Sequence, residues 1–184
     1  MFLTSDRQLI DKALSGSDRA WIKLVKRYQT EIYNHAFRMT ANHSDAFDLM
    51  QDIFLAVFRN LPGFRGESKF RTWLYRIATN HGIDFLRKRK MNTTEINPDN
   101  HSDESRFDDH IEQWQQNRII SVLLNILSVE QRTVLELKFY QQFTFEEISC
   151  QMGISVNTAK TRFYSALEKL RKQAGEDNVQ AACL

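Results

Sequence analysis

Aromatic and basic side chains are interleaved between residues 64 and 90, and their chemistry suits a nucleic-acid strand. Residues 65–90 hold eight bases against two acids, a net charge of +6. Phe64, Trp73 and Tyr75 lie among these bases. Single-stranded nucleic acid binds to stacking rings, worth about 1–3 kcal/mol per base, and to cations that contact its phosphates. The zone therefore predicts contact with an unpaired strand, although Trp73 alone also fits a core position.

The C-terminal part carries the local signals of a helix-turn-helix. Capping boxes begin at Ser128 and Thr144, and each predicts the start of a helix. Gly153 ends the second of these helices, and Ser155 caps a further one. A helix, a glycine-containing turn and a second helix have the spacing of a helix-turn-helix, with a generic helical hairpin as the alternative.

The last helix of this motif presents polar and basic side chains outward. Residues 156–172 hold five bases and one acid, a net charge of +4. The outward residues at the start of such a helix meet base edges and phosphates in the major groove. We expect the outward face to hold Asn157, Thr158, Thr161, Ser165 and Glu168, flanked by Arg162, Lys169 and Tyr164. We expect the buried face to hold Val156, Ala159, Phe163, Ala166, Leu167 and Leu170.

Three carboxylates, Asp45, Asp48 and Asp52, share one face of a further predicted helix and are flanked by Leu49 and Leu55. The opposite, apolar face is expected to hold Phe47, Met50, Phe54, Val57, Phe58 and Leu61. The acidic face is either solvated or a docking surface, with carboxylates that steer a partner and leucines that contact it. Spacing alone leaves both interpretations open.

No pattern for catalysis, a metal or a cofactor accompanies these groups. The chain has no HExxH, P-loop or GxSxG motif, and its five histidines are scattered. Cys150 and Cys183 form no CxxC pair, which is typical of reduced cytosolic thiols. The N-terminus lacks a secretory signal, and no window approaches ~18 apolar residues. We expect a cytoplasmic protein that is no enzyme, has no cofactor and no metal, and does not insert in a membrane.

The elements that must position these groups are helices. In 184 residues there are only two prolines and six glycines, too few turn-formers for a many-stranded sheet. Residues 93–113 hold seven acids and one base and few apolar side chains, so they predict a flexible linker. We expect an all-α fold with two small helical domains, residues 1–91 and 113–173, joined by the acidic linker 92–112 and followed by a tail, 174–184.

Several segments together resemble bacterial sigma factors of the extracytoplasmic-function (ECF, group IV) family. They are DAFDLMQDIF at residues 45–54, FRGES at 64–68, FRTWLYRIATN at 70–80, FEEI at 145–148 and GISVNTAKTR at 153–162. The segments span nearly the whole chain in the family's order, with the acidic linker in its place. The sequence departs from the family at Asn157, where glycine is usual, and at Ser165 and Ala166, where relatives often carry bases.

The resemblance implies a dissociable RNA polymerase subunit that recognises promoters and melts DNA in a stress or envelope response. Its partners would be promoter DNA, the polymerase core through the β′ clamp and β flap, and an anti-sigma factor. The residues that would bind the polymerase are Asp45, Asp48, Leu49, Gln51, Asp52 and Leu55. Those that would capture a −10 base are Phe64, Arg65, Gly66, Glu67, Ser68, Arg71, Trp73, Tyr75, Arg76 and Asn80. Those that would contact the −35 element are Ser155, Asn157, Thr158, Lys160, Thr161, Arg162, Tyr164 and Ser165.

The alternative is a free-standing helix-turn-helix regulator with an effector-sensing N-terminal domain. The aromatic and basic zone at residues 64–90 argues against it, because a protein that binds only duplex DNA does not need such a zone.

Overall fold

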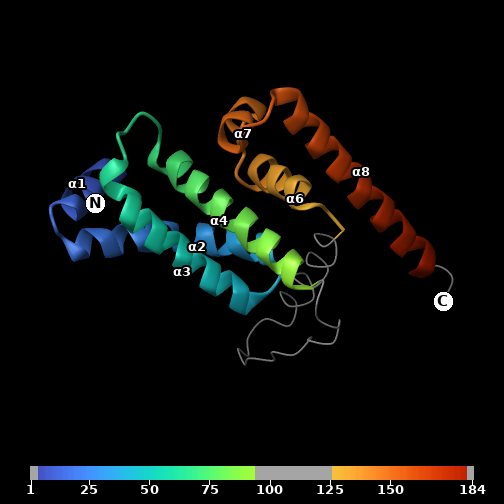
Figure 1. Cartoon of the computed structure of the whole chain (residues 1–184), viewed down its shortest axis with the longest axis horizontal. Coiled ribbons are helices and arrows are strands. Elements are labelled where there is room, and N and C mark those ends of the chain that lie inside the picture. Colours follow the sequence, from blue (N-terminus) through green and yellow to red (C-terminus); the bar gives the residue numbers. More distant parts are fainter. Residues whose placement is uncertain (1–3, 94–125, 182–184) are drawn as a thin grey trace. The chain divides into compact units, whose positions relative to one another are not determined.

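The computed structural model describes residues 4–93 and 126–181, with side chains for residues 4–89 and 126–173. Every regular element in these ranges is helical (Figure 1). The chain divides into two compact units, Met1–Phe85 and Leu86–Leu184. These observations confirm the predicted all-α fold with two helical regions. Apart from residues 92 and 93, the predicted linker lies outside the described residues.

Within residues 4–93, the N-terminal unit is built from four α-helices and one short 3-10 helix, and the last α-helix continues past Phe85. They are α1 (Asp6–Leu14), α2 (Asp18–Thr40), α3 (His43–Asn60), η1 (Leu61–Gly63) and α4 (Phe70–Thr93). Side-chain oxygens of Ser5, Ser17 and Asn42 accept backbone N–H bonds at the starts of α1, α2 and α3. Helix α2 packs against both α1 and α3.

The core of this unit is formed by apolar side chains on the inner faces of these helices. Its largest fully buried members are Leu24, Ile32, Met39, Ile53, Val57, Leu61, Leu74 and Tyr75. At Gly82, a Cβ atom would lie 3.2 Å from Cε of Met39. The glycine therefore allows α4 to approach α2 closely.

Helix α3 is rotated relative to the sequence prediction. Ala46, Leu49 and Ile53 are at most 2% exposed, whereas Phe47 and Phe58 are 52% and 53% exposed. The predicted apolar face is confirmed at Val57 and Leu61, which are at most 2% exposed, and is wrong at Phe47 and Phe58. The buried stripe contains the small Ala46, which suits close packing against α2.

The C-terminal unit contains the predicted helix-turn-helix. Its described elements are α6 (Val129–Leu135), a π-helical turn η2 (Glu136–Tyr140), α7 (Phe145–Met152) and α8 (Val156–Ala181). Both capping boxes, at Ser128 and Thr144, are confirmed. Gly153 ends α7 in the left-handed region with φ of 63°, and Ser155 Oγ accepts a hydrogen bond from Thr158 N at the start of α8.

Helices α6 and α7 both pack on α8. The core joins Leu127 and Leu135 to Ala166, with Phe163 and Leu170 packed against it. Leu167 was expected on this buried face, but it is 38% exposed. The inward stripe of α8 advances by steps of three and four residues, which places Leu167 at its edge.

Candidate nucleic-acid and partner interfaces

The loop between η1 and α4 carries a cluster of aromatic rings. Phe64 packs edge-on against Phe70, with ring centroids 5.6 Å apart, and lies 5.2 Å from the ring of Trp73. Phe70 and Trp73 are 5.7 Å apart. Phe70 is buried, whereas Phe64 and Trp73 are half-buried. The cluster therefore offers part of two rings to a ligand above a buried third ring.

Tyr75 is not part of this exposed surface, contrary to the prediction. It is 0% exposed, and its ring packs edge-on against His35 at 5.5 Å. Leu74, Tyr75 and Ala78 are all fully buried, so this face of α4 turns toward the core and takes Tyr75 with it. Basic neighbours in the sequence do not show that an aromatic ring is available for stacking, because its exposure depends on which face of the helix it occupies.

The polar groups around the loop differ in how firmly they are held. Arg65 and Glu67 are exposed and 3.9 Å apart, a contact that contributes little at a surface. Arg71, by contrast, pairs through Nε with Glu31 at 3.0 Å, and its guanidinium lies 4.9 Å from the Tyr75 ring centroid. The predicted residues Gly66, Ser68, Arg76 and Asn80 are exposed. Gly66 has φ of 74°, a conformation that suits glycine at the turn.

The outer face of α3 combines carboxylates with apolar groups. Its exposed members are Phe47, Asp48, Gln51, Asp52, Leu55, Phe58 and Arg59, and Asp45 is half-buried at its start. Leu49 is 2% exposed, so the expectation that it contacts a partner at the surface is wrong. Phe47 and Phe58 were assigned to the core and instead widen the apolar part of this face.

A histidine at the start of α3 lies beside this face. The hydroxyl of Tyr33 lies 2.7 Å from His43 Nδ1, and the His43 ring stacks on Phe37 at 4.5 Å. Partial burial lowers the pKa of His43 and raises the pKa of Tyr33. A neutral imidazole accepts the tyrosine O–H at Nδ1. No spacing in the sequence indicated this pair.

The exposed face of α8 holds most of the predicted DNA-contacting residues. Asn157, Lys160 and Thr161 are exposed, Thr158 and Arg162 are half-buried, and Tyr164 is 61% exposed. The hydroxyls of Ser155 and Thr158 bond to each other at 2.8 Å within the cap. Ser165 was expected to point outward, but it is half-buried and its Oγ accepts a hydrogen bond from Gln131 Nε2 at 2.9 Å. Packing against α6 therefore draws Ser165 away from the exposed face.

Phe145, the first residue of α7, lies near two lysines. Lys138 Nζ lies 4.9 Å from the Phe145 ring centroid and donates to the Phe143 carbonyl oxygen at 3.1 Å. Lys160 Nζ lies 5.9 Å from the same ring, which also packs edge-on against Phe163. No sequence spacing indicated Lys138, because only the tertiary fold places it on the same ring as Lys160 of α8.

The described residues show neither a metal site nor a membrane span. No three His, Cys, Asp or Glu side chains gather there in a way that could hold a metal ion. Within the same residues, every helix is too short or too polar to cross a bilayer.

Comparison with known proteins assigns both units to one family. The Sigma-70 region 2 model matches residues 24–91, and the Sigma-70, region 4 model matches residues 117–170. The ECF RNA polymerase sigma factor SigW of Bacillus subtilis is 32% identical, over 91% of this chain and 95% of its own length. CnrH, solved in complex with the cytosolic domain of CnrY, matches with a TM-score of 0.70 and 26% identity, over 94% of this chain and 98% of that one. RpoE of Bartonella quintana, solved with the anti-sigma factor NepR, is alike in fold, with a TM-score of 0.61, 21% identity and 82% and 93% coverage.

Both family models describe sigma-70 proteins, and the described helices, with a capped helix-turn-helix in the second unit, agree with this class. The chain belongs to the ECF RNA polymerase sigma factors. It is thus a subunit that directs RNA polymerase to promoters for the initiation of transcription. The family that the sequence motifs resembled is confirmed.

Proposed function

We propose that this sigma factor binds the polymerase clamp through α3, captures an unpaired −10 base at the loop of residues 64–68, and contacts the −35 element through α8. The observation that carries the proposal is the half-buried Phe64, whose ring is supported by Phe70 and Trp73. A supported but accessible ring suits an extruded base, and stacking offsets the few kcal/mol that unpairing costs.

Polymerase binding through α3 rests on its mixed outer face. Asp48 is exposed, Gln51 and Asp52 are exposed one turn further along the helix, and Leu55 adds apolar area at 53% exposure. Carboxylates steer a basic partner and set the register of docking, while apolar side chains supply contact area. Phe47 and Phe58 extend the same surface, so the proposed contact with the polymerase includes both rings.

Promoter contact through α8 rests on its cap and charge. The Ser155 cap fixes where the helix begins, and Asn157, Lys160 and Thr161 follow as exposed residues of its first two turns. These groups can bond to base edges and phosphates in a major groove. Asn157 in place of the family's usual glycine changes the hydrogen bonds available at that position.

We further propose that the chain works in the cytoplasm, where RNA polymerase acts, as a non-enzymatic subunit without a cofactor. CnrH, which is similar over 94% of this chain, has been solved with the cytosolic domain of CnrY. By analogy, an anti-sigma factor holds this chain inactive until a stress or envelope signal releases it. The alternative, a regulator that works without polymerase, would have to bind duplex promoter tightly by itself.

Permanganate reactivity of promoter thymines tests the assignment of the loop. On a promoter selected from a library by the wild-type holoenzyme, Phe64→Ala or Asn80→Ala should reduce open-complex reactivity more than binding to closed duplex. Equal reactivity in the variants and the wild type would refute base capture at this loop.

Co-purification with core polymerase tests the α3 face separately. Asp48→Ala combined with Asp52→Ala should weaken association, because both exposed carboxylates leave the docking surface. Asp11→Ala, an exposed acid on α1, is the matched control. Unchanged recovery of the double variant would refute docking through α3.

A further inference from the structure

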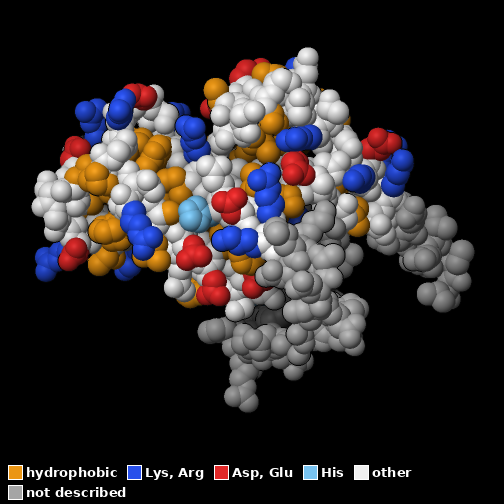
Figure 2. Space-filling view, viewed as in Figure 1, with side chains coloured by type: hydrophobic (Ala, Val, Ile, Leu, Met, Phe, Trp, Pro, Cys, Tyr) orange, Lys and Arg blue, Asp and Glu red, His pale blue; other side chains and the backbone are white. Residues whose placement is uncertain are grey.

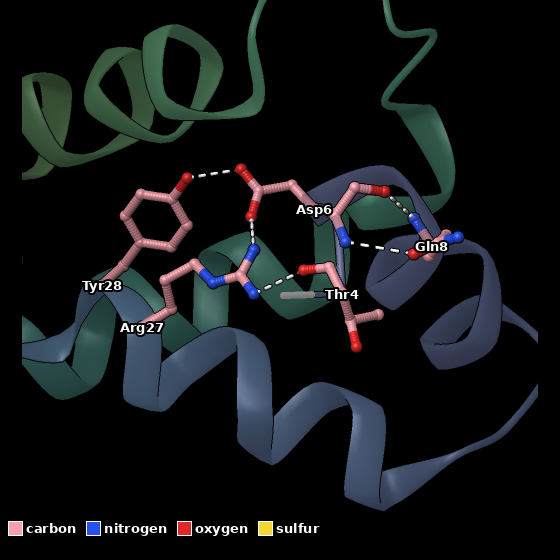
Figure 3. Close-up of polar contacts among 6 residues, drawn as sticks. Thr4, Asp6, Gln8, Arg27 and Tyr28 are labelled. Carbon is pink, nitrogen blue, oxygen red and sulfur yellow. Dashed lines mark hydrogen bonds and ion pairs between the residues drawn. The ribbon is translucent and has the colours of Figure 1, made fainter. Parts of the chain in front are cut away.

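The N-terminal helix α1 is tied to α2 by one carboxylate. The hydroxyl of Tyr28 donates to Asp6 Oδ2 at 2.5 Å, and Arg27 pairs with Asp6 Oδ1 (Figure 3). Arg27 also donates to the carbonyl oxygen of Thr4 at 2.6 Å. Asp6 is the first residue of α1, and the capping box of Ser5 and Gln8 fixes its backbone. The carboxylate therefore has a defined position between two α2 side chains.

The same tyrosine touches the aromatic cluster that supports the loop. Tyr28 is 7% exposed, and its ring packs edge-on against Phe70 at 5.5 Å. Phe70 in turn contacts both Phe64 and Trp73. One turn further along α2, Glu31 pairs with Arg71. Phe70 and Arg71, in the first turn of α4, are thus both contacted by side chains of α2. Asp6 in turn holds Tyr28, the residue that contacts Phe70.

Helix α1 also lies against the other end of the loop. It contacts η1, which ends at Gly63, directly before Phe64. Leu9, Ile10 and Leu61 are buried in this part of the unit. Helix α1 therefore contacts η1 directly at the start of the loop. It is linked to the end of the loop through Asp6, Tyr28 and Phe70.

We propose that Asp6 is a positioning residue for the base-capture loop, acting through Tyr28 and Phe70 on the ring of Phe64. The inference rests on the proposed function of the loop. In this role Asp6 needs no contact with DNA, because it holds the Tyr28 hydroxyl so that the tyrosine ring keeps its edge-on contact with Phe70. Burial, followed by the hydrogen bond to Asp6, raises the pKa of Tyr28, so this hydroxyl stays protonated and donating at neutral pH.

Without the hydrogen bond to the carboxylate, the tyrosine ring loses its anchor and no longer keeps a fixed edge-on position against Phe70. Phe70 and Phe64 then lose their fixed support. The expected loss is in discrimination at the captured base, since binding of duplex and of core polymerase uses other surfaces. A helix that served only stability would instead lower every activity in proportion to the unfolded fraction.

The test measures the affinity of holoenzyme for two −10 non-template oligonucleotides, one intact and one abasic at the captured position. If one base stacks in the loop, the wild type should prefer the intact strand by roughly 5- to 150-fold. Asp6→Ala should reduce this preference at least about threefold, the scale of coupling between residues in contact. Asp11→Ala, which removes an exposed acid from the same helix, should leave it unchanged.

Tyr28→Phe guards against misfolding, because it keeps the ring and removes only the hydroxyl. It should reproduce the reduced preference of Asp6→Ala. A wild-type preference in both variants, even with a lower unfolding temperature, would overturn the positioning role and leave the proposed function intact. A wild type without preference, or Phe64→Ala with full preference, would overturn the proposed function of the loop itself.

Discussion

The two units build their candidate DNA surfaces in different ways. In the N-terminal unit, the Phe64 ring depends on Phe70 and Trp73 of α4, on Tyr28 of α2 and, through it, on Asp6 of α1. In the C-terminal unit, the candidate surface lies mainly on the single helix α8, whose start is set by Gly153 and Ser155 just before it, and Phe145 of α7 lies near Lys160. One surface is assembled from residues distant in sequence, and the other is set locally.

This difference predicts whether a substitution at one residue alters the function of others. Residues in mutual contact couple energetically, whereas separated surface residues act independently. Changes remote from the loop should therefore alter base capture in the N-terminal unit. Changes on α8 should act one residue at a time. Figure 2 shows one face of the N-terminal unit, where hydrophobic side chains lie exposed among basic and acidic ones.

Phe70→Ala should have the largest effect on stability. Phe70 is 5% exposed and contacts Tyr28, Phe64 and Trp73, so its loss removes the centre of the aromatic cluster. We expect about 3–5 kcal/mol less free energy of unfolding, measured by urea denaturation. Tyr164→Ala, at a ring that is 61% exposed, should change it by under about 0.5 kcal/mol. A similar small change at Phe70 would contradict a cluster-supported loop.

Gly153→Ala should cost less, because its effect is confined to one backbone conformation. Gly153 has φ of 63°, and a Cβ there would meet nothing within 4 Å. Strain alone then predicts a loss of about 1–2 kcal/mol in the free energy of unfolding. Gly63→Ala is the matched control, since its Cβ also meets open space and its φ is ordinary. Equal unfolding curves for the two variants would show that the turn before α8 does not need glycine.

Lys160→Ala tests whether the α8 surface acts residue by residue. Lys160 is exposed near the start of α8. If it contacts one phosphate, its loss should flatten the log–log salt dependence of promoter binding by about 0.9. The opening of an already bound promoter should not change. An unaltered slope would mean that Lys160 contacts no phosphate.

The smallest effect is expected from acidification at His43. Burial lowers its pKa in the folded chain, so the unfolded chain binds the proton first as the pH falls. Its contribution to stability is complete above the unfolded value of about 6.5 and is lost as the pH falls from there toward the folded value. Between pH 7.5 and 5, wild type should therefore lose slightly more stability than His43→Gln, measured by thermal unfolding. An equal loss in both proteins would contradict the shift.

The same contrast explains what the sequence could predict. The caps at Ser128, Thr144 and Ser155 and the turn at Gly153 depend on neighbouring residues, so spacing located them correctly. The inward face of α3 depends on which apolar side chains meet α2, and the prediction was right at Val57 and Leu61 but wrong at Phe47 and Phe58.

Tyr75 and Ser165 were misplaced for a related reason. Tyr75 is buried against His35, and Ser165 accepts a hydrogen bond from Gln131 on α6. Each partner is more than 30 residues away, at separations of 40 and 34 positions. The contact between Asp6 and Tyr28, 22 positions apart, leaves no local signature either.

The central claim is that the loop at Phe64 acts in strand opening and α8 acts in duplex contact. Run-off transcription with core polymerase on two templates tests this claim most directly. One template is the intact promoter, and the other is the same promoter with a mismatched, pre-opened −10 region. Phe64→Ala should be impaired on the intact template and largely rescued on the pre-opened one, because strand opening no longer has to be driven by base capture. Lys160→Ala should be impaired equally on both. Equal impairment of Phe64→Ala on both templates would contradict the account.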